Sequence, residues 1–324
     1  MRGTSQMGRW RVLIGSKSFG KSIPEHIRRL EEGGCDVVPN QLGRAYRAAE
    51  LLEALESIDA IITGTDELTA EVINAAPKLK VIAKHGVGLD NIDLQAARQR
   101  GIAVGATLGA VHDSVADLTL SLMLAVARGI VPAHAAAVRG EWKGFMGMEL
   151  RGKVLGIVGL GRIGKEVCHR AQAFGMQIIA HDVYPDREFA ERHGVRFAVL
   201  EELLRSSDIV TLHAGLAQVG QPLIGAQELS LMKAGAILIN TGRGHLVDEA
   251  ALAEALGRGR LAGAGLDVFA AEPPKDSPIL KLDNVVLTPH MAGDTWDARR
   301  RLGEMTVENI LRVMRGQRPL CPVD

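Results

Sequence analysis

The chain is poor in the residues that mark several large classes of protein. Three cysteines in 324 residues are too few and too scattered for a disulfide framework or a zinc site; they are Cys35, Cys168 and Cys321. Aromatic residues make up 3% of the chain, and Lys+Arg balance Asp+Glu at 38 each. Without a basic excess, we expect no nucleic acid and no anionic membrane as partner. Residues 1–9 lack the apolar core of a signal peptide, so we expect a reduced, cytoplasmic location.

Long apolar runs are also missing. The most apolar helical stretch, residues 115–127, is interrupted by Asp117 and is too short to span a bilayer. The remaining composition, 47% hydrophobic and 23% charged, is typical of a soluble globular enzyme. A chain of 324 residues suggests about two domains.

A glycine fingerprint stands where an expected strand meets an expected helix. The apolar run 153–158 is followed by Gly159, Gly161 and Gly164 in the spacing G-x-G-x-x-G. The first glycine allows the tight turn, the second lets a pyrophosphate approach the backbone, and the third lets the helix pack close to the strand. The helix N-terminus then offers N–H groups to the phosphates.

An acidic residue completes this pattern. A second strand-like run, 177–181, ends in Asp182, 18 residues after Gly164. A carboxylate at this place accepts hydrogen bonds from the adenosine ribose and repels a 2′-phosphate. The sequence therefore predicts a dinucleotide site that prefers NAD over NADP.

Strand and helix patterns alternate on both sides of the fingerprint. Strand-like runs occur at residues 11–14, 35–38, 60–62, 81–83, 102–104, 209–212, 236–240, 264–268 and 285–288. This alternation predicts parallel sheets covered by helices on both faces. The first five runs precede the fingerprint, so we expect a separate first domain. An apolar helix over 114–128 is expected to lie between domains or against a partner subunit, and aromatic residues in the irregular segment 140–147 suit a dimer contact.

Three side chains of complementary chemistry follow successive strands after the fingerprint. Arg243, Glu272 and His290 each come just past a strand end, where ligands bind in open α/β sheets. Histidine suits proton transfer during alcohol oxidation, a carboxylate orients its ring, and arginine matches a substrate carboxylate and polarises a ketone. Singly, each reads as a surface charge or a structural histidine; their joint placement favours the catalytic interpretation. No histidine pair has the spacing of a metal site, so we expect no metal.

A second element of a site follows the strand-like run 81–83. Gly86 and Gly88 flank Val87, and two such glycines after a strand can expose consecutive N–H groups to an anion. A substrate carboxylate fits this description, and so does an ordinary glycine-rich turn; spacing alone does not choose between them.

These residues together resemble the D-isomer-specific 2-hydroxyacid dehydrogenases, especially their phosphoglycerate dehydrogenase-like branch. The matching stretches are residues 85–93, 114–117, 156–164, 240–244, 265–269 with 272–273, and 288–290. The resemblance implies that Arg243, Glu272 and His290 are catalytic, with His290 as acid and base. It implies backbone binding of the carboxylate at Val87 and Gly88. The implied substrate-binding set is Lys84, His85, Val87, Gly88 and Arg243; the implied cofactor set is Gly159, Gly161, Arg162, Ile163, Gly164, Asp182, Thr241 and Asp267, with Asp267 holding the nicotinamide amide.

The resemblance also implies an architecture of two doubly wound α/β domains. A flavodoxin-like substrate domain would comprise residues 1–107 and 296–324, with a Rossmann domain of residues 108–295 inserted in it and the cleft between them. Members are usually dimers through the nucleotide domain, so we expect a homodimer. We see no regulatory domain after the last helix.

Two departures from the family pattern concern the substrate and the adenine. Relatives of phosphoglycerate dehydrogenase often carry an arginine after the third strand, where this chain reads Thr63-Gly64-Thr65; Lys84 is the remaining candidate for a phosphate partner. The usual proline-containing loop reads instead as residues 214–218, which alters the adenine side of the pocket.

The sequence thus predicts an NAD-dependent oxidoreductase that interconverts a D-2-hydroxy acid and its 2-keto acid. The choice among 3-phosphoglycerate, glyoxylate, hydroxypyruvate and another small 2-keto acid stays open, because motifs do not fix a substrate. Two alternatives remain: a non-enzymatic NAD-sensing protein that binds a partner, and a dehydrogenase of a substrate such as formate or phosphite.

Overall fold

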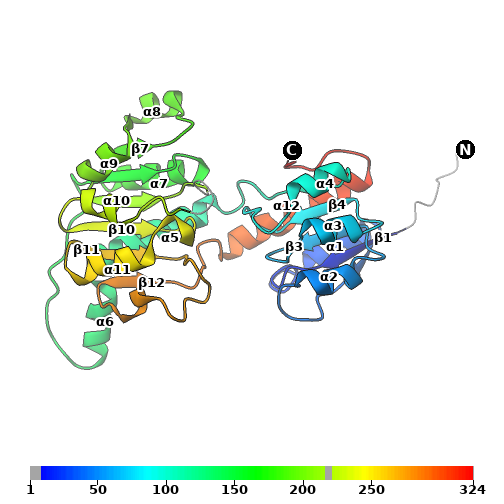
Figure 1. The fold of residues 1–324 in the computed structure, drawn as a ribbon, viewed down its shortest axis with the longest axis horizontal. Coiled ribbons are helices and arrows are strands. Elements are labelled where there is room, and N and C mark those ends of the chain that lie inside the picture. Colours follow the sequence, from blue (N-terminus) through cyan, green and yellow to red (C-terminus); the bar gives the residue numbers. More distant parts are fainter. Residues whose placement is uncertain (1–8, 216–220, 324) are drawn as a thin grey trace, which may run out of the picture. The chain divides into compact units, whose positions relative to one another are not determined.

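The computed structural model describes residues 9–215 and 221–323. The chain forms two compact units, which we describe separately (Figure 1). The first comprises Met1–Val111 and Thr295–Asp324, and the second comprises His112–Asp294. Most of the altered adenine-side loop, residues 216–218, lies outside the described residues.

The first unit is built on a parallel sheet of five strands in the order β2-β1-β3-β4-β5. The strands are β1 (Trp10–Ile14), β2 (Cys35–Val38), β3 (Ala60–Thr63), β4 (Val81–Lys84) and β5 (Ala103–Gly105). Its helices are α1 (Glu25–Glu32), α2 (Ala48–Ala54), α3 (Ala70–Ala75), α4 (Leu94–Gln99) and α12 (Trp296–Met314). The order is that of flavodoxin-like folds.

Both faces of this sheet are covered because successive strand residues point to opposite sides. Leu13, Ile61 and Ile82 pack with residues of α2, α3 and α4 on one face. Ile14 and Ile62 pack on the other face, with residues of α1 and α12. The returning helix α12 is thus part of the first unit's core, although it follows the whole second unit in the chain.

The second unit contains a parallel sheet of seven strands in the order β12-β11-β10-β9-β6-β7-β8. The strands are β6 (Val154–Val158), β7 (Gln177–His181), β8 (Arg196–Phe197), β9 (Ile209–Leu212), β10 (Ala236–Asn240), β11 (Leu261–Leu266) and β12 (Val285–Leu287). Its helices are α5 (His112–Ala127), α6 (Ile130–Val138), α7 (Arg162–Ala173), α8 (Arg187–His193), α9 (Leu200–Ser206), α10 (Ala226–Leu231) and α11 (Glu249–Gly257), with 3₁₀ turns η1 (Gly244–Leu246) and η2 (Pro278–Lys281). The chain reverses direction across the sheet between β6 and β9, as in Rossmann folds. The predicted pair of parallel α/β sheets is confirmed.

The apolar helix α5 has a simpler role than the sequence indicated. Leu120, Leu122 and Met123 belong to the core of its own unit, where α5 packs with α7 on one face of the sheet. Its apolar character therefore reflects burial on its own sheet. No single helix within the described ranges is long and apolar enough to cross a membrane; the pair α5 and α6, bent by 64°, meets that test only by length and composition.

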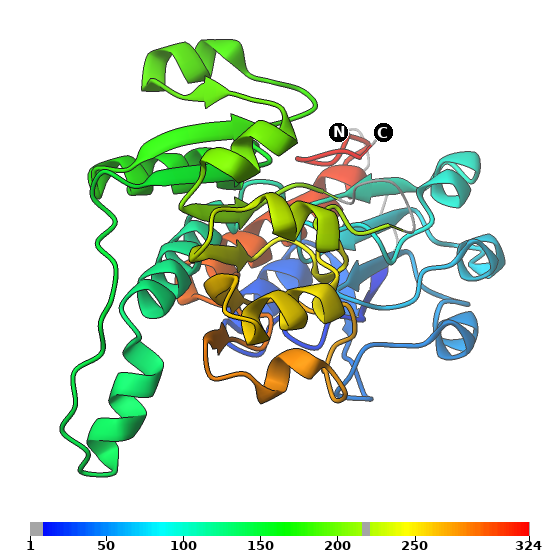
Figure 2. The same ribbon diagram turned by 60° about the vertical axis from the view of Figure 1, so that its left-hand side comes forward.

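Helix α6 was not expected from the sequence. It begins directly after Gly129, whose φ of 58° ends α5, and Pro132 occupies its first turn. Helix α6 and the irregular segment 139–149 stand away from the sheet of their unit in both views (Figures 1 and 2). Trp142 and Met146 on this segment are almost fully exposed. We call residues 130–149 the arm.

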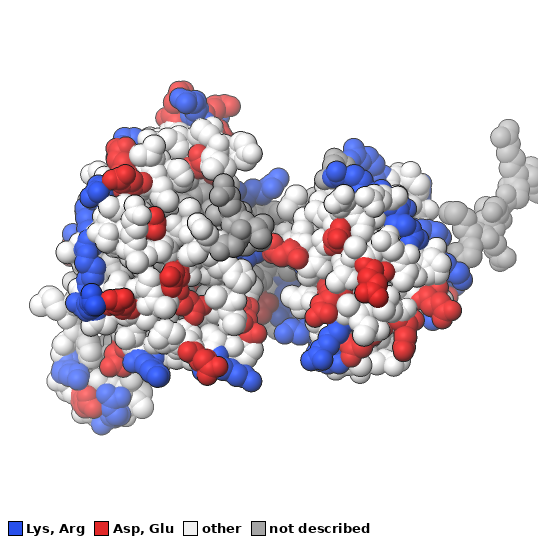
Figure 3. Space-filling view, viewed as in Figure 1, with Lys and Arg blue, Asp and Glu red and all other residues white. Residues whose placement is uncertain are grey.

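The surface carries charges of both signs. Acidic and basic side chains are interspersed over the visible face of each unit (Figure 3). This distribution agrees with the balanced composition of the chain.

Candidate active site

The turn after β6 shows why its three positions are glycine. Gly159 has a φ of 94°, and a Cβ there would lie 2.5 Å from the amide nitrogen of Ala214. A Cβ on Gly164 would lie 2.2 Å from the carbonyl oxygen of Gly159, so the start of α7 packs directly on the turn. A Cβ on Gly161 would meet nothing within 4 Å. The backbone at Gly161 therefore faces open space, as a site for a pyrophosphate requires.

The start of α7 is suited to binding phosphate. The helix begins after Gly161 without a side-chain cap, so its first N–H groups keep their hydrogen-bonding capacity. Arg162 is exposed at this end, and Ile163 packs partly into the core of the unit. Thr241, nearly buried after β10, shares a 2.8 Å hydrogen bond with the Thr119 hydroxyl of α5.

The carboxylate of Asp182 is fixed at the end of β7, the strand beside β6. Its Oδ2 accepts a 2.7 Å hydrogen bond from the Leu160 amide, and its Oδ1 accepts one of 2.9 Å from the Tyr184 amide. The carboxylate is therefore held against the fingerprint turn itself. Uncapped helix, open glycine and anchored acid fit a dinucleotide with a ribose diol at its adenosine end.

The turn after β10 carries Arg243. The Asn240 side chain accepts from the Gly242 amide at 3.0 Å and donates to the Arg243 carbonyl at 2.9 Å, which fixes the turn. Arg243 Nη1 donates to the Gly242 carbonyl at 2.9 Å. A Cβ on Gly244 would lie 1.9 Å from the carbonyl carbon of Phe269, so this turn packs against the one after β11.

The turns after β11 and β12 bring Glu272 and His290 together. The Nδ1 atom of His290 lies 2.7 Å from Oε2 of Glu272, while Oε1 of Glu272 accepts from the Phe269 amide at 3.1 Å. Because Nδ1 donates to the carboxylate, the Nε2 atom of neutral His290 is left with its lone pair for a proton. Both side chains are partly exposed, 53% for His290 and 39% for Glu272, as expected for groups that meet a ligand.

Asp267 is completely buried at the end of β11. Its Oδ1 accepts from the Thr288 hydroxyl at 2.6 Å and from the Met291 amide at 2.9 Å, and its Oδ2 accepts from the Ala292 amide at 2.9 Å. All three donors belong to the turn that bears His290. The expected contact of Asp267 with nicotinamide stays a prediction.

In the first unit, the side chains of Lys84 and His85 turn into their own unit. The Lys84 ammonium donates to the Gly64 carbonyl and, at 2.6 Å, to Oδ1 of Asn91, and the residue is only 6% exposed. The His85 Nδ1 lies 3.2 Å from the Thr306 hydroxyl, and its ring meets Phe19 edge-on. Burial, together with nearby cationic residues, lowers the pKa of His85 to about 3, so the ring is neutral at neutral pH.

The backbone beside these residues is the part that stays available. Gly86 has a φ of 153°, and its N–H and C=O both bond to the Thr107 hydroxyl. The N–H groups of Val87 and Gly88 donate to no acceptor in the described part of the chain, and both residues are half-buried. Two consecutive open N–H groups form a concave anion site, so this geometry favours the carboxylate interpretation over the ordinary turn.

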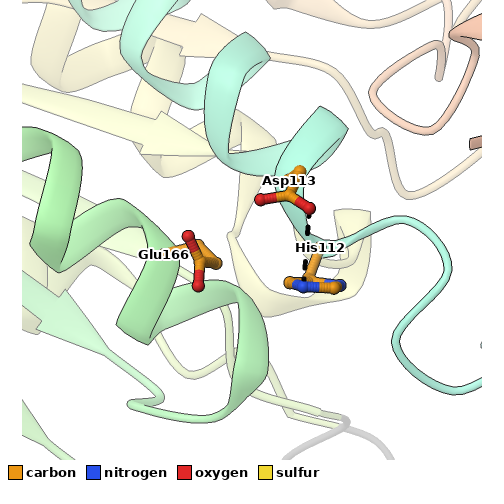
Figure 4. A group of neighbouring side chains, drawn as sticks. All are labelled: His112, Asp113 and Glu166. Atoms are coloured by element: carbon orange, nitrogen blue, oxygen red, sulfur yellow. Dashed lines mark ion pairs between the residues drawn. The ribbon is translucent and has the colours of Figure 1, made fainter. Parts of the chain in front are cut away.

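An acidic cluster between α5 and α7 has a structural explanation. His112, Asp113 and Glu166 point toward one another (Figure 4). Arg170 bonds to Asp113 at 3.1 Å, to Asp117 at 2.7 Å and to Glu166 at 2.6 Å. Burial acts against the charge of Arg170, but these bonds raise its pKa. The guanidinium already supplies the cation for these carboxylates, so we assign the cluster to an ion-pair network joining the two helices.

Sequence reasoning missed several residues that shape the site. Asn240 and Thr288 fix the turns that bear Arg243 and His290, and their signal was only a polar residue at a strand end. His213 directly follows β9, and its Nε2 atom lies 2.9 Å from the Thr211 hydroxyl. Burial lowers its pKa to about 3, and its Nδ1 has no hydrogen-bond partner among the residues described.

Known proteins match the chain over most of its length. A family model for the D-isomer specific 2-hydroxyacid dehydrogenase, NAD binding domain, matches residues 120–292. A D-3-phosphoglycerate dehydrogenase of Methanocaldococcus jannaschii is 48% identical over 296 residues, which cover 90% of this chain and 56% of that protein. A glyoxylate reductase of Thermococcus litoralis is 45% identical over 309 residues, 92% of this chain and 93% of that protein. The crystal structure of a Thermus thermophilus protein has a TM-score of 0.88 and 43% identity, and the match covers 97% of this chain and 100% of that one.

The fold and the nucleotide site define a dinucleotide-binding protein of the Rossmann type. More narrowly, the chain belongs to the D-isomer specific 2-hydroxyacid dehydrogenase family. Its second unit contains the NAD-binding domain of that family, and NAD is its cofactor. The predicted family and cofactor are confirmed. The chain spans about half the length of the M. jannaschii relative and nearly all of the T. litoralis relative.

Proposed function

We propose that the chain is an NAD-dependent dehydrogenase that interconverts a D-2-hydroxy acid and its 2-keto acid. The observation that carries this proposal is the 2.7 Å contact between His290 and Glu272, because the turn that bears Glu272 also packs against the Arg243 turn. These turns follow β10, β11 and β12, three neighbouring strands of the sheet that holds the glycine fingerprint. The alignment of proton carrier, carboxylate and guanidinium at one sheet edge suits oxidation of an alcohol beside a carboxylate.

Each side chain has a distinct task in the proposed reaction. Arg243 presents a planar fork to the substrate carboxylate and polarises the carbonyl oxygen. His290 takes the hydroxyl proton at Nε2 during oxidation and returns it during reduction, and Glu272 stabilises the charged ring through Nδ1. NAD, when bound at the fingerprint turn, supplies the hydride acceptor. The open N–H groups of Val87 and Gly88 bind the substrate carboxylate.

The substrate we favour is a small, unphosphorylated 2-keto acid such as glyoxylate or hydroxypyruvate. The end of β3 reads Thr63-Gly64 and carries no arginine, and the Lys84 ammonium already bonds to Gly64 and Asn91. A phosphorylated substrate would therefore lack both expected cationic partners. The name of the T. litoralis relative, glyoxylate reductase, is consistent with this choice.

We further propose that two copies associate through the arm. Trp142 and Met146 are almost fully exposed there, and Ile130, Val131 and Val138 add apolar surface on α6. Apolar side chains gathered on a projecting segment are typical of a subunit contact. Separately, we keep as a proposal the domain boundaries expected at residues 107/108 and 295/296.

The test is kinetic. With glyoxylate, hydroxypyruvate, pyruvate and phosphohydroxypyruvate as substrates, His290→Ala should lower kcat about 10²–10⁴-fold, because general acid–base catalysis contributes that much. NADH affinity should persist. His193→Ala on α8, whose ring stacks on Phe189, is the matched control and should keep kcat. Turnover near the wild-type rate in His290→Ala contradicts the assignment.

The same panel separates the alternatives. A wild-type chain that binds NADH but oxidises it with none of these acids would support the NAD-sensing protein. NAD reduction by formate or phosphite, without turnover of 2-keto acids, would support the other dehydrogenase class. Repeating the panel with NADPH measures how strongly Asp182 discriminates between the cofactors.

A further inference from the structure

Asp267, whose carboxylate is buried, forms four hydrogen bonds with the segment that carries His290. Three are the side-chain bonds to Thr288, Met291 and Ala292 described above. The fourth is a 2.9 Å hydrogen bond from the His290 amide to the Asp267 carbonyl. The residue that directly follows β11 thus holds the turn after β12.

The held segment has a conformation that needs support. His290 has a φ of 51°, and it is the only non-glycine residue with positive φ in the part of the chain that the structure describes. A left-handed backbone at a residue with a Cβ is disfavoured and persists where surrounding contacts fix it. A carboxylate that accepts from the two amides directly after His290 supplies such contacts.

We propose that Asp267 is a positioning residue for His290, acting by fixing the backbone on both sides of it. This inference rests on the proposed function of His290. With the turn in place, the imidazole lies within 2.7 Å of Glu272; with the turn released, that contact is lost. The carboxylate also has spare accepting capacity, because Oδ2 accepts one hydrogen bond from the described residues and has two lone pairs. The nicotinamide amide expected at Asp267 would then share its anchor with the acid/base turn.

A second role follows from that shared anchor. A cofactor amide bonded to the same carboxylate would sit at a fixed distance from the His290 turn. The Asp267 carboxylate alone would then position both the cofactor amide and His290. This distinguishes the proposal from a simple cofactor contact, which would leave His290 unaffected when the carboxylate is changed.

The experiment is a double-mutant cycle of Asp267→Asn and Glu272→Gln. Asn has nearly the shape of Asp, but its NH₂ group cannot accept from the amides of Met291 or Ala292. We expect Asp267→Asn to lower kcat about 100-fold at saturating NADH, the loss that a misplacement of about 1 Å can produce. If Asp267 acts through the His290–Glu272 pair, the double variant should lose little beyond the worse single variant.

Two further variants control for folding and for charge. Thr288→Val removes one of the three side-chain bonds and leaves the carboxylate, so we expect a loss of about 3–10-fold in kcat if one bond of several is removed. It keeps the proposal testable should Asp267→Asn fail to fold. Asp283→Asn makes the same chemical change at an exposed position just before β12 and should keep wild-type kinetics.

A readout that does not need turnover separates this inference from the proposed function. The proton on the Nδ1 atom of His290 can be observed by NMR in each variant at one fixed pH. Loss of the Glu272 contact removes the hydrogen bond that holds this proton, so its downfield signal should move upfield or disappear by exchange in both Asp267→Asn and Glu272→Gln. The NMR measurement needs no turnover, so it tests the inference even if no acid in the panel is a substrate.

Three outcomes would overturn the inference. The first is an unchanged NMR signal of the His290 Nδ1 proton in Asp267→Asn. The second is a multiplicative loss of kcat in the double variant, which would show that Asp267 and Glu272 act independently. The third is a loss of NADH affinity in Asp267→Asn with full kcat at saturating NADH, which would leave Asp267 as a cofactor contact only.

Discussion

The two units use the carboxyl ends of their sheets in different ways. In the second unit, Arg243, Glu272 and His290 present side chains, and buried partners such as Asn240 and Asp267 fix the turns that bear them. In the first unit, the polar side chains at the end of β4 turn inward: Lys84 bonds to Gly64 and Asn91, and His85 approaches Thr306. There the backbone N–H groups of Val87 and Gly88 remain available to bind an anion.

This difference separates two kinds of recognition. Side chains at a strand end can carry protons and polarise a carbonyl, and such work needs rotamers that are held in place. Backbone N–H groups bind an anion by shape, and they do so whatever the side chains are. The first unit is therefore expected to bind substrate and the second to transform it. Equivalent substitutions in the two units should give unequal losses.

The largest difference is expected between Arg243→Met and Lys84→Met, which each remove one cation. Arg243→Met should lower kcat/KM about 10³-fold, since loss of one preorganised donor to developing charge commonly costs 10²–10³. Lys84→Met should lower kcat/KM less than tenfold and instead lower the thermal unfolding temperature, because two internal acceptors lose their donor. Steady-state kinetics and thermal melts on both variants make the comparison.

The substrate series sharpens this test. If Lys84 bound a substrate phosphate, Lys84→Met would affect phosphohydroxypyruvate selectively and leave glyoxylate unchanged. We expect a similar, small effect on every acid in the panel. Equal losses of kcat/KM in Arg243→Met and Lys84→Met would contradict the proposed difference between the units.

A smaller effect is expected where the backbone is the ligand. Val87→Pro removes one N–H group without introducing charge, while Val87→Ala keeps it. Because a hydrogen bond to a charged group contributes about 1.5–3 kcal/mol, Val87→Pro should raise KM for the 2-keto acid about 10–100-fold. NADH affinity should be unchanged. An equal rise of KM in Val87→Ala would assign the effect to the side chain.

Features of local origin could be predicted from the sequence. The reasons for Gly159, Gly161 and Gly164 are short-range, and the structure bears out each of them. The parallel sheets followed from strand and helix alternation. The identity of the chemically active side chains followed from their order after strands, and the roles given to them stay predictions.

Features set by distant segments could not be predicted. The inward orientation of His85 depends on Phe19 and Thr306, which lie far from it in the chain. The anchoring role of Asp267 depends on the next strand's turn. Helix α6 was missed; in the structure Gly129 separates it from α5 and Pro132 lies in its first turn, where proline is tolerated.

The smallest effect near neutral pH, and one common to both units, concerns the partly buried imidazoles of His85 and His213. Burial lowers the pKa of His85 and of His213 to about 3, from 6.5 in the absence of burial. Between pH 6.5 and about 3 the unfolded chain binds protons at these groups that the folded chain does not bind. Stability therefore rises with pH through this window and is lost as pH falls. Each group should favour unfolding about tenfold per pH unit below about 6.5.

Thermal unfolding between about pH 6.5 and 5 tests this in each unit separately. His85→Gln keeps a polar partner for Thr306, and His213→Gln keeps one for Thr211; neither glutamine titrates. Each variant should show a weaker fall in unfolding temperature on acidification than the wild type, and the double variant should show the weakest. At about pH 7–8 the pH dependence of kcat should match that of the wild type in both, because the two rings are already neutral there. An unfolding temperature that does not change with pH in the wild-type chain would contradict the lowered pKa of both rings. If one variant alone removed the change, the effect would belong to the histidine of that unit only.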